Sequence, residues 1–260
     1  MSRDADCDFN VLAAAAHPDD IEFMMAGTLL RLKDAGAKIH MWNLANGHCG
    51  TARHSREEII RIRAAEAEAS AWLAGAVSHP ALFDDLDLFY DRPSLARVAA
   101  VVREIRPSII LTHSPQDYME DHQNACRLLV SAAFSRGMRN FVTDPPRDAW
   151  DRPVAIYHAL PHGLKDSLGQ PVRPDIFVDV GSVMDRQRAM LACHRSQKEW
   201  LDVSQGVDAY LAEMERMSVD VGRMSGRFTH AEGWRVHGTL GFGPDGFNPF
   251  KEHLREVLHA

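Results

Sequence analysis

The stretch Ala13-Ala14-Ala15-Ala16-His17-Pro18-Asp19-Asp20-Ile21-Glu22 decides the fold, because a buried strand changes into a helix within it. The apolar run from Phe9 to Ala16 predicts a short buried strand, and apolar side chains at helical spacing predict one helix from Ile21 to about Ala35. The proline suits a helix entry, and an Asp in the first turn can cap free N–H groups. One imidazole and two carboxylates therefore follow the C-terminal end of a strand, where open α/β sheets bind ligands.

A second polar cluster has the same setting: Thr112-His113-Ser114-Pro115-Gln116-Asp117-Tyr118-Met119-Glu120-Asp121-His122. It follows a buried run from Ser108 to Thr112 and precedes an amphipathic helix predicted from about Gln123 to Ser135. Because two strand ends can converge in a doubly wound sheet, the His and Asp side chains of both clusters can meet. Two His and one Asp with an open fourth position form the pattern of a catalytic zinc site. For the first cluster alone, a capping Asp beside an incidental His is the alternative interpretation.

Predicted strands and helices alternate along the rest of the chain. Strands are predicted over Lys38–Leu44, Val77–Phe83, Val154–Ala159 and Ile176–Val180, and helices over Glu57–Ala74, Pro93–Arg106, Asp185–Leu191 and Val207–Ser218. This alternation predicts an α/β, Rossmann-like fold with a mostly parallel sheet and helices on both faces. No internal repeat or clear linker interrupts it, so we expect one domain over residues 1–260.

Composition and charge exclude several classes of protein. The 45% hydrophobic and 25% charged content of these 260 residues is ordinary for a globular protein. A net charge of −7 supplies no basic face, which argues against a nucleic-acid partner. Four scattered cysteines without a C-x-x-C motif, Cys7 among them, indicate free thiols and a cytoplasmic location. Residues 1–8 lack a signal-peptide core, and no apolar run is long enough to span a membrane.

The two polar clusters resemble the signature motifs of a known family. His17-Pro18-Asp19-Asp20 and Asp117-Tyr118-Met119-Glu120-Asp121-His122 are similar to those of the PIG-L/LmbE-like zinc deacetylases. Further segments resemble the family in order and spacing: Asn46-Gly47-His48-Cys49-Gly50-Thr51, Arg63-Ala64-Ala65-Glu66, Leu191-Ala192-Cys193-His194-Arg195-Ser196-Gln197 and Ala231-Glu232-Gly233-Trp234-Arg235. The resemblance covers most of the chain and implies an LmbE-like fold that hydrolyses an amide at a metal ion.

The resemblance also implies a role for individual residues. His17, Asp20 and His122 match the ligands of the family's Zn²⁺, which lowers the pKa of bound water towards about 7. Asp19 matches the general base that takes a proton from this water as it attacks the amide carbonyl. Asp121 resembles the carboxylate that supports the ligand histidine, although a helix N-cap is a compatible alternative.

One position departs from the family pattern. Met119 stands where many members have a histidine that stabilises the oxyanion or protonates the amine, and a thioether can do neither. His194 is the first candidate to replace it and His113 the second, each balanced against a purely structural histidine. Candidate substrate contacts are Arg53, Arg63, Asp117 and His113; for the arginines a solvated surface, and for the aspartate an Asx turn, are the alternatives.

Three functions are open at this point, and in the first of them the acetyl group and the sugar come only from the resemblance. The first is a zinc-dependent hydrolase that cleaves the N-acetyl bond of an N-acetylglucosamine-type sugar or a related small molecule. The second is an amidase that acts on a non-sugar amide or a thiol conjugate. The third is a non-catalytic Rossmann-like binding module, although the first strand-helix turn lacks the G-x-G-x-x-G of a dinucleotide site. Related enzymes often form oligomers, so a homo-oligomer is an open expectation.

Overall fold

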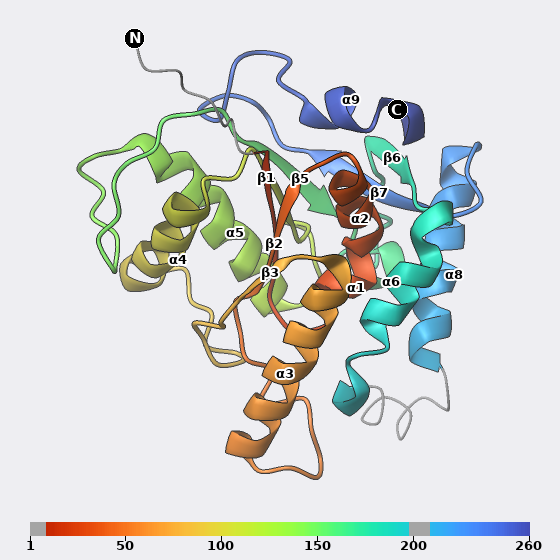
Figure 1. The fold of residues 1–260 in the computed structure, drawn as a ribbon, viewed down its shortest axis with the longest axis horizontal. Helices are drawn as coiled ribbons and strands as arrows, with labels where there is room; N and C mark the ends of the chain where they lie inside the picture. Colours follow the sequence, from red (N-terminus) through yellow and green to blue (C-terminus); the bar gives the residue numbers. More distant parts are fainter. Residues whose placement is uncertain (1–8, 198–208) are drawn as a thin grey trace.

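One sheet runs through the centre of the computed structural model, which describes residues 9–197 and 209–260 (Figure 1). The order of its eight strands is β3-β2-β1-β4-β5-β7-β6-β8. The strands are β1 (Asn10–Ala15), β2 (Lys38–Asn43), β3 (Val77–His79), β4 (Ile109–Thr112), β5 (Ala155–Ala159), β6 (Ile176–Asp179), β7 (Ala231–Val236) and β8 (Leu258–His259). Strands β1 to β5 pair in parallel, whereas β7 is antiparallel to β5 and β6. The predicted mostly parallel sheet is confirmed; the antiparallel strand β7 was not predicted.

Helices cover both faces of this sheet. They are α1 (Asp20–Met24), α2 (Ala26–Asp34), α3 (Arg56–Ala74), α4 (Arg92–Ile105), α5 (Glu120–Phe134), α6 (Met184–Leu191), α8 (Ala209–Ser225) and α9 (Pro249–His253). In Figure 1, α4 and α5 lie on one side of the strands, and α1, α2, α6 and α8 lie on the other. Alternate residues of β1 pack on opposite sides, Val11 towards α2 and Leu12 towards α4 and α5. Burial on both faces explains why this strand is apolar from Val11 to Ala15.

The helix predicted from Ile21 to about Ala35 is in fact two helices. The chain breaks at Met25, between α1 and α2, where φ is −135°. The break gives α2 an N-terminus of its own, and the N–H groups of Gly27 and Thr28 donate to the Glu232 carboxylate of β7 at 2.8 and 2.7 Å. A continuous helix would have used these donors internally, so a contact distant in sequence replaced the local pattern.

Other differences at element boundaries are small. Strand β3 stops at His79 rather than at the predicted Phe83, because Pro80 cannot donate to a ladder. Helix α3 has clear signals at both ends: Ser55 and Glu58 form a capping box, and Gly75 ends the helix at φ 62°. Residues 1–8, which include Cys7, and the start of the helix predicted from Val207 lie outside the described residues.

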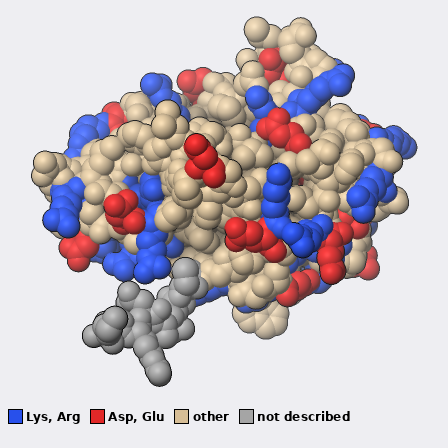
Figure 2. All heavy atoms as spheres, turned by 90° about the horizontal axis from the view of Figure 1, so that it is seen from above, with Lys and Arg blue, Asp and Glu red and all other residues tan. Residues whose placement is uncertain are grey.

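In the part of the chain that the structure describes, no helix is both long and apolar enough to cross a membrane. On the face seen in Figure 2, Lys and Arg side chains are mixed with Asp and Glu.

Candidate metal centre and active site

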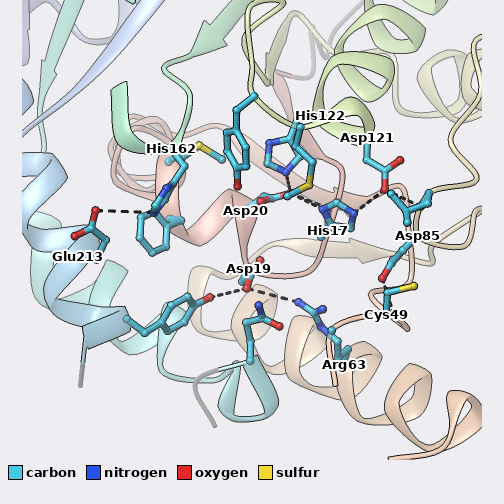
Figure 3. A pocket seen from close by; sticks show the side chains of 18 residues that line it. His17, Asp19, Asp20, Cys49, Arg63, Asp85, Asp121, His122, His162 and Glu213 are labelled. Atoms are coloured by element: carbon cyan, nitrogen blue, oxygen red, sulfur yellow. Dashed lines mark hydrogen bonds and ion pairs between the residues drawn. The ribbon is translucent and has the colours of Figure 1, made fainter. Parts of the chain in front are cut away.

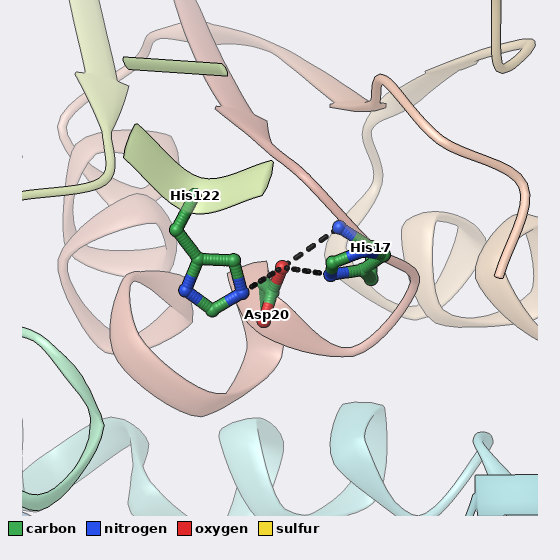
Figure 4. A group of neighbouring side chains, drawn as sticks. All are labelled: His17, Asp20 and His122. Atoms are coloured by element: carbon green, nitrogen blue, oxygen red, sulfur yellow. Dashed lines mark hydrogen bonds and ion pairs between the residues drawn. The ribbon is translucent and has the colours of Figure 1, made fainter. Parts of the chain in front are cut away.

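Three side chains from two loops converge at the carboxyl edge of the sheet (Figure 4). His17 and Asp20 follow β1, and His122 lies in the first turn of α5, which follows the neighbouring strand β4. Oδ2 of Asp20 lies 3.5 Å from Nδ1 of His17 and 3.4 Å from Nε2 of His122. Tetrahedral ligands bound at about 2.0–2.1 Å lie roughly 3.3–3.4 Å apart, so the Asp20 oxygen is at ligand spacing from both rings. All three atoms lie within 4.8 Å of one another, close enough to be candidate ligands of one metal ion.

Two carboxylates fix the orientation of the imidazole rings. Nε2 of His17 bonds to Asp121 at 3.0 Å, and Nδ1 of His122 bonds to Asp117 at 3.0 Å. The other nitrogen of each ring is thereby turned towards Asp20. Nε2 of His122 is buried and has no hydrogen-bond partner among the described residues. Carboxylate-supported histidines with a free inner nitrogen are what a metal centre requires.

A second group of side chains has ligand atoms close enough together to be considered as a metal site: His113, Asp117 and His122. The two imidazole rings, however, are stacked 4.0 Å apart with planes only 12° from parallel. Their lone pairs lie in the ring planes and therefore do not converge on one ion. Nε2 of His113 instead accepts the N–H of Ala16 at 2.8 Å, so this buried histidine holds the end of β1.

Asp19 stands apart from the metal ligands in an uncommon backbone conformation. Its φ of 103° lies in the left-handed region, and its side chain makes no capping hydrogen bond to α1. The carboxylate accepts the Tyr210 hydroxyl at 2.7 Å, and the same oxygen lies 3.5 Å from Nη2 of Arg63 (Figure 3). The strained backbone thus directs this carboxylate into the site rather than to the helix end.

The two adjacent carboxylates have opposite electrostatic environments. Burial raises the pKa of Asp19, the charge of Asp20 adds to this effect, and Arg63 opposes it. Burial also disfavours the charged form of Asp20, but the imidazoles of His122 and His113 hold its pKa well below the usual range. Neighbouring acids with separated pKa values can divide their roles, one as a permanent anion and the other as a proton acceptor.

The site opens into a cavity of about 420 Å³ (Figure 3). Its wall includes His17, Asp19, Asp20, Arg63, Met119, Asp121 and His122, and also Phe23, Cys49, Asp85, Tyr118, His162, Gln197, Tyr210 and Glu213. This volume suits a small molecule rather than a polymer chain.

Arg63 is the only candidate substrate contact that the structure places on this wall, as far as the described residues show. It is 3% exposed, and its guanidinium donates to the carbonyls of Pro18 at 2.6 Å and Gly47 at 3.1 Å. Arg63 therefore joins two loops of the site. Arg53 is exposed and lies off the wall, and Asp117 is fully buried behind His122.

His194 does not occupy the place left by Met119. It is completely buried, absent from the cavity wall, and its Nε2 lies 3.2 Å from Oε1 of the equally buried Glu22. The cavity instead receives His162, whose Nε2 lies 4.0 Å from Oε1 of Glu213 (Figure 3). Sequence reasoning missed His162, Glu213 and Tyr210, because they come from an irregular loop and an ordinary amphipathic helix that carry no motif.

Comparison with known proteins extends these observations. Residues 12–134 match the family model described as GlcNAc-PI de-N-acetylase (PIG-L). The chain is 30% identical over 233 residues to a diacetylchitobiose deacetylase of Thermococcus kodakarensis, covering 86% of this chain and 82% of that one. It is 26% identical over 203 residues to a 4-oxalmesaconate hydratase of Pseudomonas putida, covering 73% and 74%. A solved structure of N,N'-diacetylchitobiose deacetylase from Pyrococcus horikoshii superposes with a TM-score of 0.76 at 22% identity, covering 93% and 88%.

Proposed function

The chain belongs to the PIG-L family of de-N-acetylases, and from this premise we propose that it hydrolyses the N-acetyl bond of an N-acetylglucosamine-type sugar or a related small molecule. One observation carries the proposal: the donor atoms of His17, Asp20 and His122 converge beside the Asp19 carboxylate. The deacetylase relative from Thermococcus kodakarensis supports an acetylated amino sugar as the substrate.

Zinc is the metal that we propose for this centre. Two imidazoles and one carboxylate with a free fourth position form the ligand set of a catalytic zinc ion. Iron or cobalt can use the same ligands, so the identity of the metal has to be measured. When bound, the metal would lower the pKa of a water molecule and polarise the amide carbonyl.

Asp19 is the base in this proposal. Its raised pKa suits a group that takes a proton from the attacking water and then passes it to the departing amine. Tyr210 and Arg63 hold the accepting oxygen in place, at 2.7 and 3.5 Å. Asp121 and Asp117 hold the rings of the two ligand histidines. We assign His162, rather than His194, as the imidazole that faces the substrate, because it lies on the cavity wall.

Further properties of the chain are part of the same proposal. A single domain is supported by strands from Asn10 to His259 that join in one sheet. A cytoplasmic location is supported by the free thiols of Cys49, Cys126 and Cys193. A homo-oligomer stays a prediction, which light scattering after gel filtration would test.

The proposal is tested by measuring metal content and acetate release together. Wild type should hold about one zinc per chain at this centre and release acetate from N-acetylglucosamine derivatives. Asp20→Asn should lose both properties, because it removes a ligand. Asp19→Asn should keep the metal and lose activity, because it removes only the base. Asp34→Asn, an exposed carboxylate paired with Arg186, is the matched control and should keep both.

Other results would favour other functions. Metal without acetate release from any sugar substrate would favour the amidase that acts on a non-sugar amide. If the protein instead adds water to an unsaturated acid, its function would be that of a hydratase, as in the relative from Pseudomonas putida. A reconstituted wild type without metal would refute the mechanism.

A further inference from the structure

A second cluster of metal-ligating side chains lies along the same cavity. His48, Cys49 and Asp85 each offer one ligand atom, and the three atoms lie within 4.8 Å of one another. His48 and Cys49 come from the loop after β2, and Asp85 comes from the loop after the neighbouring strand β3. Figure 3 shows Cys49 and Asp85 on the side of the cavity beyond His17 and Asp121. None of the three belongs to the first metal group.

The hydrogen bonds of His48 determine which ring nitrogen carries the proton and which one faces Cys49. Nδ1 accepts the backbone N–H of Asp85 at 3.3 Å, so the ring proton of the neutral imidazole resides on Nε2. Nε2 faces Sγ of Cys49 at 3.5 Å. A metal ion at Nε2 would move the ring proton to Nδ1 at the expense of the 3.3 Å bond from Asp85, whereas the thiol would lose its proton. The 3.5 Å between Nε2 and Sγ is close to the separation of two ligands on one ion.

The loop that carries these donors is held in place by its own contacts. The Asp85 carboxylate accepts the N–H groups of Gly47 at 2.6 Å and Cys49 at 2.8 Å. Arg63 donates to the Gly47 carbonyl at 3.1 Å, and the φ of 77° at Gly47 suits glycine. Each Asp85 oxygen keeps a lone pair after these bonds. The donors are therefore positioned before any ligand arrives, which lowers the entropy cost of binding.

The charge around the cluster favours a cation. Partial desolvation, with the carboxylates of Asp85, Asp121 and Asp84, raises the pKa of the Cys49 thiol. The thiol therefore stays protonated until a cation offsets this negative charge. A thiolate and an imidazole together prefer thiophilic metals over calcium or magnesium.

We propose that Nε2 of His48, Sγ of Cys49 and a carboxylate oxygen of Asp85 bind a second divalent metal ion of the thiophilic class, such as Zn²⁺ or Cd²⁺. The S–H bond breaks as the sulfur–metal bond forms, and that proton goes to solvent; the ring proton of His48 moves from Nε2 to Nδ1, so the imidazole stays neutral. This site is separate from the centre of His17, Asp20 and His122, and its existence does not depend on the hydrolase function. Because Cys49 and Asp85 line the cavity, the bound ion would lie where a substrate enters.

Titration of metal-free protein with Cd²⁺ and Co²⁺ tests this proposal. The readouts are the number of equivalents bound and the ultraviolet charge-transfer absorption that a thiolate gives with either ion. Wild type should bind two equivalents and develop the absorption. Cys49→Ser should bind one and develop none. Cys193→Ser removes another free thiol and should match wild type.

Two additional variants keep the result unambiguous. His48→Gln should also lose the second equivalent, and unchanged thermal unfolding of each metal-free variant shows that its fold is intact. Asp20→Asn should lose the first equivalent and keep the charge-transfer absorption, which separates failure of the hydrolase proposal from failure of this one. A single equivalent in wild type, or undiminished absorption in Cys49→Ser, would overturn the second site.

Discussion

Glu232 should make this protein less stable as the pH rises from about 4.5 to about 7. Its buried carboxylate accepts N–H groups from Gly27, Thr28 and the side chain of Gln187. Burial raises its pKa from 4.5 to about 7 against the opposing effect of these hydrogen bonds. The folded state therefore holds a proton that the unfolded state has already released. That stabilisation is complete below pH 4.5 and is lost as the pH passes 7; at about 1.4 kcal/mol per pH unit, it amounts to about 3 kcal/mol.

Urea unfolding of wild type and Glu232→Gln measures this loss. A range from roughly pH 4 to roughly pH 8 extends below the pKa of Glu232 in the unfolded state and above its pKa in the folded state. The difference in unfolding free energy between the two proteins should change by about 3 kcal/mol across that range, in favour of the variant at high pH. Titrations elsewhere, including those at the metal ligands, are common to both proteins and cancel. Glu104→Gln, at an exposed carboxylate, should give a curve parallel to wild type. A pH-independent difference for Glu232→Gln would refute the reasoning.

Three further predictions concern other parts of the molecule. Tyr157→Phe should cost about 1–3 kcal/mol in thermal unfolding, because it leaves a buried backbone N–H, 3.2 Å from the hydroxyl, without its acceptor; an unchanged melting temperature would contradict this. Gly222→Ala should cost about 1–3 kcal/mol in urea unfolding, because its Cβ would lie 2.5 Å from a carbonyl oxygen, whereas Gly238→Ala enters open space and serves as the control. Asp117→Asn should weaken metal binding about 10–100-fold in chelator competition, because the His122 ring loses its carboxylate; equal affinity would show that the 3.0 Å bond does not support the metal.

The convergence of His17, Asp20 and His122 could be predicted from the sequence because its signals are local. His17, Asp19 and Asp20 directly follow a strand whose apolar run is continuous, and His122 follows another such strand. Parallel pairing of β1 with β4 then brings the two loops together. The start of α3 depends on an equally local signal, the capping box of Ser55 and Glu58.

The opposite wall could not be predicted, because it depends on contacts between residues distant in sequence. Tyr210 reaches Asp19 across 191 positions, and nothing in its own helix distinguishes it from a core aromatic residue. His162 lies in a loop without periodicity, so only the folded chain shows that it faces the cavity. The position of His194 off the cavity wall could not be predicted for a related reason: its motif gave no indication of the buried Glu22 that it contacts.

The contact between Glu232 and the start of α2 also has a consequence for synthesis on the ribosome. The two partners are separated by 205 positions, so the first turn of α2 must wait for nearly the whole chain to be translated. At about 5–20 residues per second, that interval lasts on the order of 10–40 seconds. Until then the N–H groups of Gly27 and Thr28 at the start of α2 have only water as a partner. A nascent chain or a truncated product therefore exposes an unfinished centre, and a complete one forms only after β7 has joined the sheet.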